Sequence, residues 1–365
     1  MKRQIIDAHY HNCQWFSHGQ TFLEFQQEYR EKCGVTGFLL LCVPGIKGQA
    51  THFCPAQNIL GAISKLEDKT NSTYVYGGLF YPDAPIIPEK TAEYNFKAQA
   101  EKLMEIGYDG MKMFESKPTI NKKLKYGVDR EGYEEYFAYL EENEIPLLMH
   151  VNDPHNFWDP ETAPPLARQN GWFYGDGTFA TKEEIYAQVY NVLERHPKLK
   201  VTLPHGFFLC DGPEGLSELF DTYENVYTDL APGPVFLEAM SNDYENWKVF
   251  FNKYYKRILF ATDAKNFSPF PLTDRLFNDV YRFIATDDVY SAFDYYDSEC
   301  TLHGMGLSEE KLNAVLAENY LDIVGHREPK AINREALAKY IEEFIPNLVD
   351  GETKDEIIRY YKANF

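Results

Sequence analysis

The stretch Asp7-Ala8-His9-Tyr10-His11 follows two isoleucines and is predicted to end a short buried strand. Because side chains alternate along a strand, we expect Asp7 and the two histidines on one face, with Ala8 and Tyr10 on the other. Two imidazoles at positions i and i+2 can bind one cation, and neutral imidazole suits zinc and similar ions. Such a pair in isolation is more often solvated, so its meaning depends on the rest of the chain.

Seven more strand-like buried runs follow, and most are separated by segments with helical spacing. They span residues 36–43, 73–81, 108–114, 146–151, 199–205, 225–230 and 257–263. None is joined to the next as a hairpin, and this alternation is typical of an α/β fold, the parallel (β/α)₈ TIM barrel. We expect the barrel to span residues 1–326. Residues 327–365 are predicted to form a C-terminal helical extension that packs on the barrel or on a partner subunit in a homo-oligomer.

The composition of the 365 residues argues against several classes of protein. Hydrophobic residues make up 44% and aromatic residues 16%, which is ample for a large core. A net charge of −20 disfavours nucleic acid and anionic membranes as partners, so we expect a small-molecule substrate. The chain starts without an apolar leader and contains no apolar run of membrane-spanning length. The cysteines lack CxxC spacing, which predicts reduced thiols in a cytoplasmic protein; they are Cys13, Cys33, Cys42, Cys54, Cys210 and Cys300.

Five residues stand at the C-terminal ends of predicted strands: His9, His11, His150, His205 and Asp263. In a (β/α)₈ barrel this end carries the active site, so these side chains are expected to meet in one pocket. Histidines and a carboxylate with one open position are the donor set of a hydrolytic zinc-type site. Each histidine alone is more often structural, but a chance arrangement of all five at the same barrel end is hard to sustain.

Several motifs resemble the amidohydrolase superfamily, in particular its amidohydrolase-related branch of metal-dependent hydrolases and decarboxylases. These motifs are DAHYH (7–11), MKMF (111–114), LLMHVNDP (147–154), TLPHG (202–206), RILFATD (257–263) and AENYLDIVG (317–325). The likeness covers roughly residues 4–326 and implies a TIM barrel.

The resemblance implies a role for each of the five residues. His9, His11, His150 and Asp263 would bind one divalent metal ion, zinc in the first instance, with manganese or another divalent ion as the alternative. Asp263 would also accept a proton from water. His205 would lie beside the ion, where it polarises the substrate or binds a second ion. Asp263 and His205 are therefore the predicted catalytic residues.

Lys112 has three readings. In some superfamily members a lysine on strand four is carboxylated and bridges two metals, so a second ion is expected only if Lys112 carries this modification. Alternatively, its ammonium holds a substrate carboxylate. The structural reading is a buried lysine paired with Asp7 or Glu115. We favour an uncarboxylated Lys112 beside a single metal ion, with Asp7 one layer deeper, where it supports a ligand or pairs with Lys112.

The stretch 151–180 follows His150 and is unusually long for a barrel loop, which is typical of a lid. Its candidates for substrate binding are His155, Trp158 and Trp172, and Trp15 is predicted to lie on the same rim. For each aromatic residue, packing of the loop onto the barrel is an equal alternative.

Three functions remain open. The first is a metal-dependent hydrolase acting through activated water on a small carbonyl compound, a lactone, amide or ester that carries a carboxylate. The second is a non-oxidative, metal-dependent decarboxylase of an aromatic or enol acid. Such enzymes tend to hold the carboxylate with arginine, and Arg168 alone stands in an evident catalytic-face loop, which favours hydrolysis. The third is a metal-binding barrel without turnover.

Overall fold

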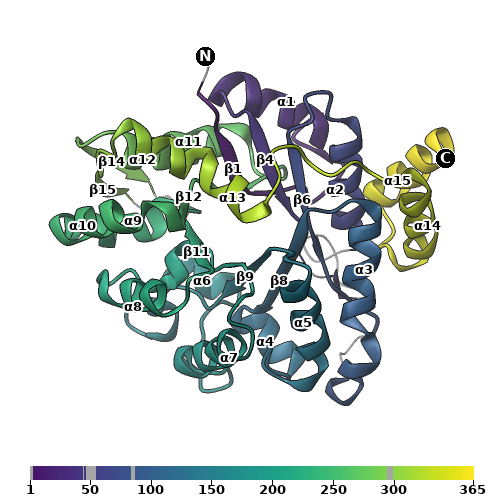
Figure 1. The fold of residues 1–365 in the computed structure, drawn as a ribbon, viewed down its shortest axis with the longest axis horizontal. Coiled ribbons are helices and arrows are strands. Elements are labelled where there is room, and N and C mark those ends of the chain that lie inside the picture. The colour runs from purple at the N-terminus through teal and green to yellow at the C-terminus, as the bar shows by residue number, and fades with distance from the viewer. Residues whose placement is uncertain (1–2, 44, 47–54, 84–86, 294–298) are drawn as a thin grey trace.

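The predicted strands pair side by side in one parallel sheet in a computed structural model that describes residues 3–43, 45–46, 55–83, 87–293 and 299–365 (Figure 1). Along the sheet the strands follow chain order: β1 (Ile6–His11), β4 (Gly37–Leu41), β6 (Thr73–Gly78), β8 (Gly110–Ser116), β9 (Leu147–Val151), β10 (Val201–Thr202), β11 (Val226–Asp229) and β12 (Ile258–Leu259), with β13 (Ala264–Lys265) beside β1.

The two ends of this sheet belong to the same run of the chain, so the sheet closes into a barrel. β12 pairs with β11 through Asp229 and Leu259, and β13 pairs with β1 through Tyr10 and Ala264. Between them, Phe260 O accepts a hydrogen bond from the Ala8 amide at 3.0 Å. The predicted α/β barrel is therefore confirmed.

Helices surround the barrel, as Figure 1 shows. They are α1 (Phe22–Cys33), α2 (Ala56–Glu67), α3 (Phe96–Ile106), α4 (Pro118–Leu124), α5 (Glu134–Glu142), α6 (Pro165–Gln169), α7 (Lys182–Arg195), α8 (Glu214–Thr222), α9 (Pro234–Asn242), α10 (Tyr244–Tyr254), α11 (Phe270–Ala285), α12 (Glu309–Asn313), the π-helical segment η6 (Ala314–Glu318) and α13 (Asn319–Val324). Local signals begin and end several of them. Thr21 and Glu24 form a capping box at the start of α1, and Gly34 in the left-handed conformation ends it.

Short elements complete the described chain. The 3₁₀ turns are η1 (Pro88–Tyr94), η2 (Glu131–Tyr133), η3 (His155–Trp158), η4 (His205–Phe208), η5 (Tyr255–Arg257) and η7 (Ile345–Asn347); the strand pairs are β2 (Phe16–Ser17) with β3 (Gln20–Thr21), β5 (Gly45–Ile46) with β7 (Phe80–Tyr81), and β14 (Val289–Phe293) with β15 (Glu299–His303). The antiparallel β14–β15 pair was not predicted. Its side chains alternate between buried and exposed because one face packs on the protein, where the His303 amide bonds to Ser241 on α9.

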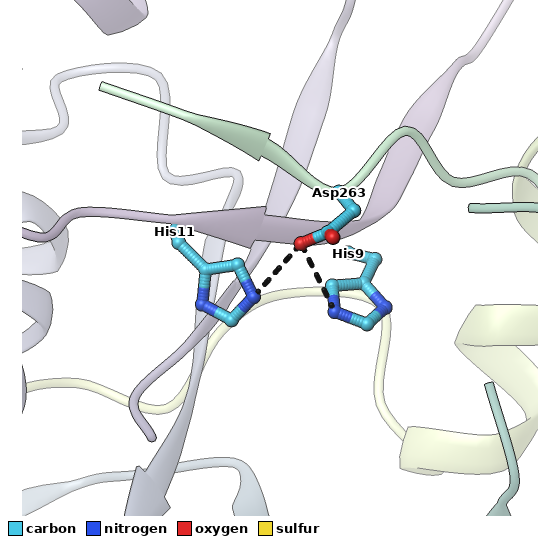
Figure 2. A group of neighbouring side chains, drawn as sticks. All are labelled: His9, His11 and Asp263. Atoms are coloured by element: carbon cyan, nitrogen blue, oxygen red, sulfur yellow. Dashed lines mark ion pairs between the residues drawn. The ribbon is translucent and has the colours of Figure 1, made fainter. Parts of the chain in front are cut away.

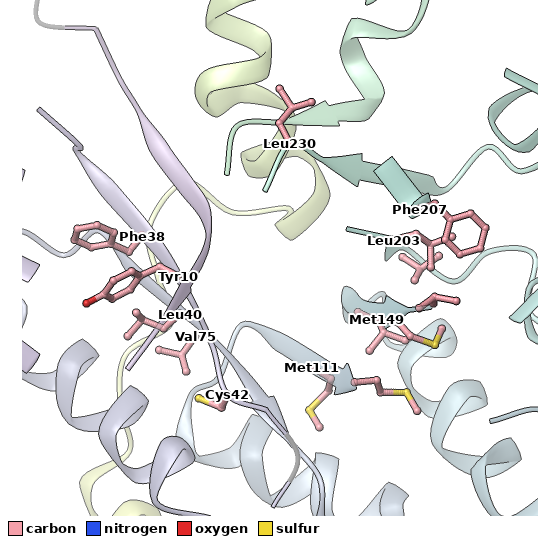
Figure 3. Close-up of a cluster of buried hydrophobic side chains, with 14 of the residues drawn as sticks. Tyr10, Phe38, Leu40, Cys42, Val75, Met111, Met149, Leu203, Phe207 and Leu230 are labelled. Atoms are coloured by element: carbon pink, nitrogen blue, oxygen red, sulfur yellow. The ribbon is translucent and has the colours of Figure 1, made fainter. Parts of the chain in front are cut away.

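The barrel strands bury both faces. One set of side chains faces the surrounding helices; Figure 3 shows part of it, including Tyr10, Phe38 and Leu40. The other set fills the barrel interior, where Leu39 and Leu148 pack against Leu321 and its neighbours on α13. This segment closes the N-terminal end of the barrel, because Asn319 also donates to Ile258 O at 2.7 Å. The opposite end is left for a cavity.

The prediction that Asp7 shares a face with His9 and His11 is wrong, because β1 is irregular between these residues. The pairing of β1 with β4 shifts register between Asp7 and Tyr10. Asp7 therefore lies in the layer between β1 and α1, where it accepts hydrogen bonds from the Tyr29 hydroxyl at 2.9 Å and the Thr262 hydroxyl at 2.6 Å. Ala8 packs in the barrel interior instead.

The C-terminal residues form α14 (Arg334–Phe344) and α15 (Glu352–Asn364), which pack beside α2 and α3. Tyr340 accepts a hydrogen bond from Asn58 on α2 at 2.8 Å. Among the described helices, none combines the length and apolar character needed to cross a membrane. The described cysteines are free thiols, and Cys54 lies outside the described residues.

Candidate metal centre

A cavity of about 610 Å³ opens at the C-terminal ends of the barrel strands. The structure brings all five strand-end residues of the predicted site to its wall: His9, His11, His150, His205 and Asp263. The four histidines are buried. Burial disfavours the charged imidazolium and lowers their pKa values, to about 4 for His150. The site therefore presents four neutral imidazoles.

His9, His11 and Asp263 meet from the ends of β1 and the eighth strand run (Figure 2). Oδ1 of Asp263 lies 3.2 Å from Nε2 of His11 and 3.6 Å from Nε2 of His9. The register of β1 with β13, Tyr10 opposite Ala264, sets this approach. Asp263 itself adopts the left-handed region, with φ of 56°, and turns its carboxylate toward both rings.

Each of the four imidazoles donates one ring N–H to a fixed acceptor. Nδ1 of His9 lies 2.7 Å from Asp229 Oδ2, and Nδ1 of His11 lies 2.7 Å from Leu41 O. Nδ1 of His205 donates to Ala231 O at 2.6 Å, and Nε2 of His150 donates to Asn152 O at 2.8 Å. These bonds leave the second nitrogen of every ring with its lone pair directed into the site.

Asp229 is a functional candidate that the sequence analysis missed. It is fully buried at the end of β11, and its second oxygen, Oδ1, accepts the backbone N–H groups of His205 at 2.8 Å and Ala231 at 3.2 Å. Burial raises its pKa to about 6, although His205 and Lys112 oppose the shift. Its place at the end of a predicted strand was the available signal, because all five predicted residues share it.

Lys265 stabilises the ionised form of the Asp263 carboxylate. Burial alone would raise the pKa of Asp263, but the Lys265 ammonium, 2.9 Å from Oδ2, acts together with His11 and His9 to keep that pKa well below its usual value. Lys265 also lines the cavity. The carboxylate is therefore ionised and able to bind a cation or accept a proton.

Lys112 lines the same cavity from β8, with Gly78 and Leu148 as its register neighbours. It is 1% exposed, and its Nζ makes no hydrogen bond with any described residue. Burial lowers its pKa to about 7, while Asp263, Asp229 and Glu115 act in the opposite direction. The structure thus contradicts direct pairing of Lys112 with Asp7 or Glu115. The Glu115 carboxylate instead accepts hydrogen bonds from Tyr81 and from the Phe114 amide.

The loop after β9 has a small core of its own, formed by Phe157, Ala167 and Tyr174. It is tied to the barrel by Asp153, whose two oxygens lie 2.6 and 2.5 Å from Nζ of Lys117, and whose Oδ2 accepts the Tyr174 hydroxyl. The long stretch that the sequence places after His150 thus contains two short helical segments, η3 and α6.

Of the four predicted substrate-binding residues outside the strands, the structure brings Trp172 alone to the described cavity wall. Trp158 packs on Tyr174, with ring centroids 4.8 Å apart, and His155 is exposed. The Trp15 ring lies 6.0 Å from that of Tyr360 on α15, and its backbone amide donates to Thr353 Oγ1 at 3.1 Å. These three side chains are not among the described residues of the cavity wall, and their role in substrate binding stays a prediction.

A family model described as Amidohydrolase matches residues 89–322, well over half of the chain. The chain belongs to the amidohydrolase family. The match includes Lys112, His150, His205 and Asp263, whereas His9 and His11 precede it. A search of curated protein sequences found no match to this amidohydrolase.

Solved structures share the fold of this amidohydrolase. A 2,6-dihydroxybenzoate decarboxylase in complex with 2,6-dihydroxybenzoate superposes with a TM-score of 0.54 at 10% identity, covering 88% of this chain and 99% of the other. A TIM-barrel protein from Bordetella bronchiseptica superposes with a TM-score of 0.54 at 13% sequence identity, and the match covers 88% of this chain and 100% of the other. A dihydroxybenzoic acid decarboxylase from Polaromonas sp. JS666, with bound manganese and the inhibitor 2-nitroresorcinol, superposes with a TM-score of 0.52 at 10% sequence identity. The match covers 88% of this chain and 97% of the other.

The donor set of this amidohydrolase fits a divalent cation. Nδ1 of His150 and Nε2 of His205 face each other at 3.0 Å, and both carry lone pairs because their partner nitrogens donate to carbonyls. The lone pairs of His9 and His11 likewise face the Asp263 carboxylate. Such contacts repel unless a cation joins them, and two ligands of one zinc-like ion lie about 3.3 Å apart.

Proposed function

We propose that this amidohydrolase is a metal-dependent hydrolase that acts on a lactone, amide or ester carrying a carboxylate. The observation that carries the proposal is the approach of Asp263 to His9 and His11, with the lone pairs of both rings directed at its carboxylate. His9, His11, His150 and Asp263 would hold one divalent ion, zinc first and manganese as the alternative. When bound, the ion would supply Lewis acidity to a carbonyl oxygen and lower the pKa of water.

The protein groups would divide the proton chemistry. Asp263, kept ionised by Lys265, would accept a proton from the attacking water and pass it to the leaving group. The Nδ1–H of His205 is engaged by Ala231 O, so its Nε2 is an acceptor. This tautomer favours ligation or proton acceptance over donation to an oxyanion. Asp229 would fix the ring of His9.

Decarboxylation of an aromatic acid is the second candidate. Aromatic side chains, among them Phe114, Trp172 and Phe208, line the cavity and could enclose a planar ring. The named decarboxylases with the same fold are consistent with this alternative. Against it, no arginine occurs among the described residues of the cavity wall, and Arg168 is exposed with its guanidinium bonded to Pro160 O.

The test combines metal analysis with a substrate screen. Purified protein is expected to hold about one equivalent of a zinc-like ion, which the His9→Ala/His11→Ala double variant loses. A panel of carboxylated lactones, amides and esters should then yield hydrolysis that Asp263→Asn reduces by about two orders of magnitude or more. Carbon dioxide release from hydroxybenzoic or β-keto acids, without hydrolysis of any panel member, would replace the hydrolase by the decarboxylase. Absence of metal after reconstitution would reject both.

A further inference from the structure

Lys112 is a buried ammonium whose described surroundings provide no hydrogen-bond acceptor for it. Its side chain belongs to the cavity wall, together with the histidines and Asp263, and Nζ is left without a hydrogen bond. A buried charge is costly unless it is paired, so an anion beside Nζ would stabilise the charged form of Lys112. The cavity beside it is the place from which that anion can come.

The other charges of the cavity wall leave Lys112 in a special position. Although the whole chain has a net charge of −20, the described residues that line the cavity include four lysines and two aspartates. Lys117 is paired with Asp153, and Lys265 is paired with Asp263. Lys123 is exposed and solvated. Lys112 is therefore the buried cation of the described wall that has no carboxylate in contact.

The walls near Lys112 indicate the shape of the group that carries the anion. Nζ of Lys112 lies 5.9 Å from the centroid of the Phe114 ring, and the Phe114 ring lies 4.7 Å from that of His150. Trp172 and Phe208 add apolar surface to the same cavity. Flat rings of this kind favour a planar apolar body by stacking and by exclusion of water.

We propose that Lys112 is the receptor for a carboxylate borne on a planar ring, so that the substrate class is a cyclic or aromatic carboxylate. The inference rests on the proposed function, because the recognised group would lie beside the proposed metal site. Lys112 forms a charge-assisted hydrogen bond with the carboxylate and orients the ring, and the reacting carbonyl faces the histidines.

The experiment measures binding of benzoate and its neutral isostere benzamide to the metal-loaded protein by calorimetry. Wild type should bind benzoate about tenfold or more tightly than benzamide. Lys112→Met should abolish this preference by weakening benzoate alone. Lys123→Met, at an exposed lysine of the same cavity, is the matched control and should leave both affinities unchanged. Equal weakening by the two variants, or full benzoate affinity in Lys112→Met, would overturn the proposal, as would a wild type that does not bind benzoate.

Carboxylation of Lys112 is the competing outcome and has its own readout. Wild-type protein and Lys112→Met are each incubated with ¹³C-bicarbonate and their NMR spectra compared. We expect no carbamate resonance that is present in wild type and absent from Lys112→Met. Such a resonance would mean that Nζ carries an anion of its own, and it would overturn the receptor role. Benzoate binding requires no turnover, so a failed hydrolysis screen with intact benzoate selectivity would reject the proposed reaction and leave the receptor role standing.

Discussion

The carboxylate of Asp229 joins two histidine residues of the candidate metal centre: Oδ2 accepts the Nδ1–H of the His9 ring at 2.7 Å, and Oδ1 accepts the backbone N–H of His205 at 2.8 Å. One fully buried side chain thus orients the first histidine of β1 and the turn that carries the histidine after β10. The His9 ring cannot rotate without breaking its bond to this carboxylate, and the His205 ring is fixed by its bond to Ala231 O, whose residue donates its own amide to Asp229 Oδ1. This arrangement links the geometry of the candidate ligands from two distant strands.

Asp229→Asn should therefore weaken metal binding without replacing any proposed ligand. The amide cannot accept on both sides, so the tautomer of His9 loses its partner, and the metal Kd should rise about 10- to 100-fold. Competition with a chromophoric chelator measures this change. Asp221→Asn, at an exposed aspartate paired with Lys253, is the control. An unchanged Kd in Asp229→Asn would show that Asp229 does not orient the ligands.

Lys112→Met should raise the stability of the metal-free protein. The substitution keeps the length of the side chain and removes a buried charge without a contact partner, so we expect a gain of about 1–3 kcal/mol in the free energy of unfolding. Denaturant unfolding gives the value. A variant less stable than wild type would indicate that Lys112 contributes to the fold through interactions with the protein.

Lys117→Met should lower the free energy of unfolding, in contrast to Lys112→Met, although Lys117 lies only five residues after Lys112. It leaves Asp153 buried without its cation, and the expected loss is about 3–5 kcal/mol. Lys123→Met, which alters an exposed side chain in the same cavity, should change stability little. Equal effects of Lys117→Met and Lys123→Met would contradict a stabilising role of the Lys117–Asp153 pair.

The titration of Glu115 should make the free energy of unfolding decrease as the pH rises. Burial raises its pKa from 4.5 to about 7, so the folded state retains a proton that the unfolded chain has lost. The contribution is complete below pH 4.5, decreases between pH 4.5 and about 7, and amounts to about 3 kcal/mol in all. Glu115→Gln should remove this slope, whereas the exposed Glu131→Gln should retain it. Parallel pH profiles for wild type and Glu115→Gln would refute the assignment.

The barrel was predictable because its strands are buried on both faces and their carboxyl ends carry histidines and aspartates. Burial and strand position require no long-range information, and they placed His150, His205 and Asp263 at one end of the barrel. The face of Asp7 could not be predicted, because a shift in the pairing of β1 with β4 breaks the alternation.

The loop residues were predicted least well. An aromatic residue such as Trp158 is equally able to line a cavity or to pack on Tyr174, and the path of the backbone decides between the two. The same applies to Trp15, which turns toward the C-terminal helix. Composition reveals neither path. By contrast, Asp229 was within reach, because its position at a strand end was the criterion already applied to the other residues.

The small core within the loop after β9 has a consequence for how this protein could acquire new specificities. Phe157, Ala167 and Tyr174 hold the loop together, and Asp153 fastens it to the barrel at the rim. The ligand geometry belongs to the strands and the cavity roof to a separately packed insert. Substitutions in this loop can therefore alter the cavity wall at Trp172 without replacing any of the strand-end residues His9, His11, His150, His205 and Asp263.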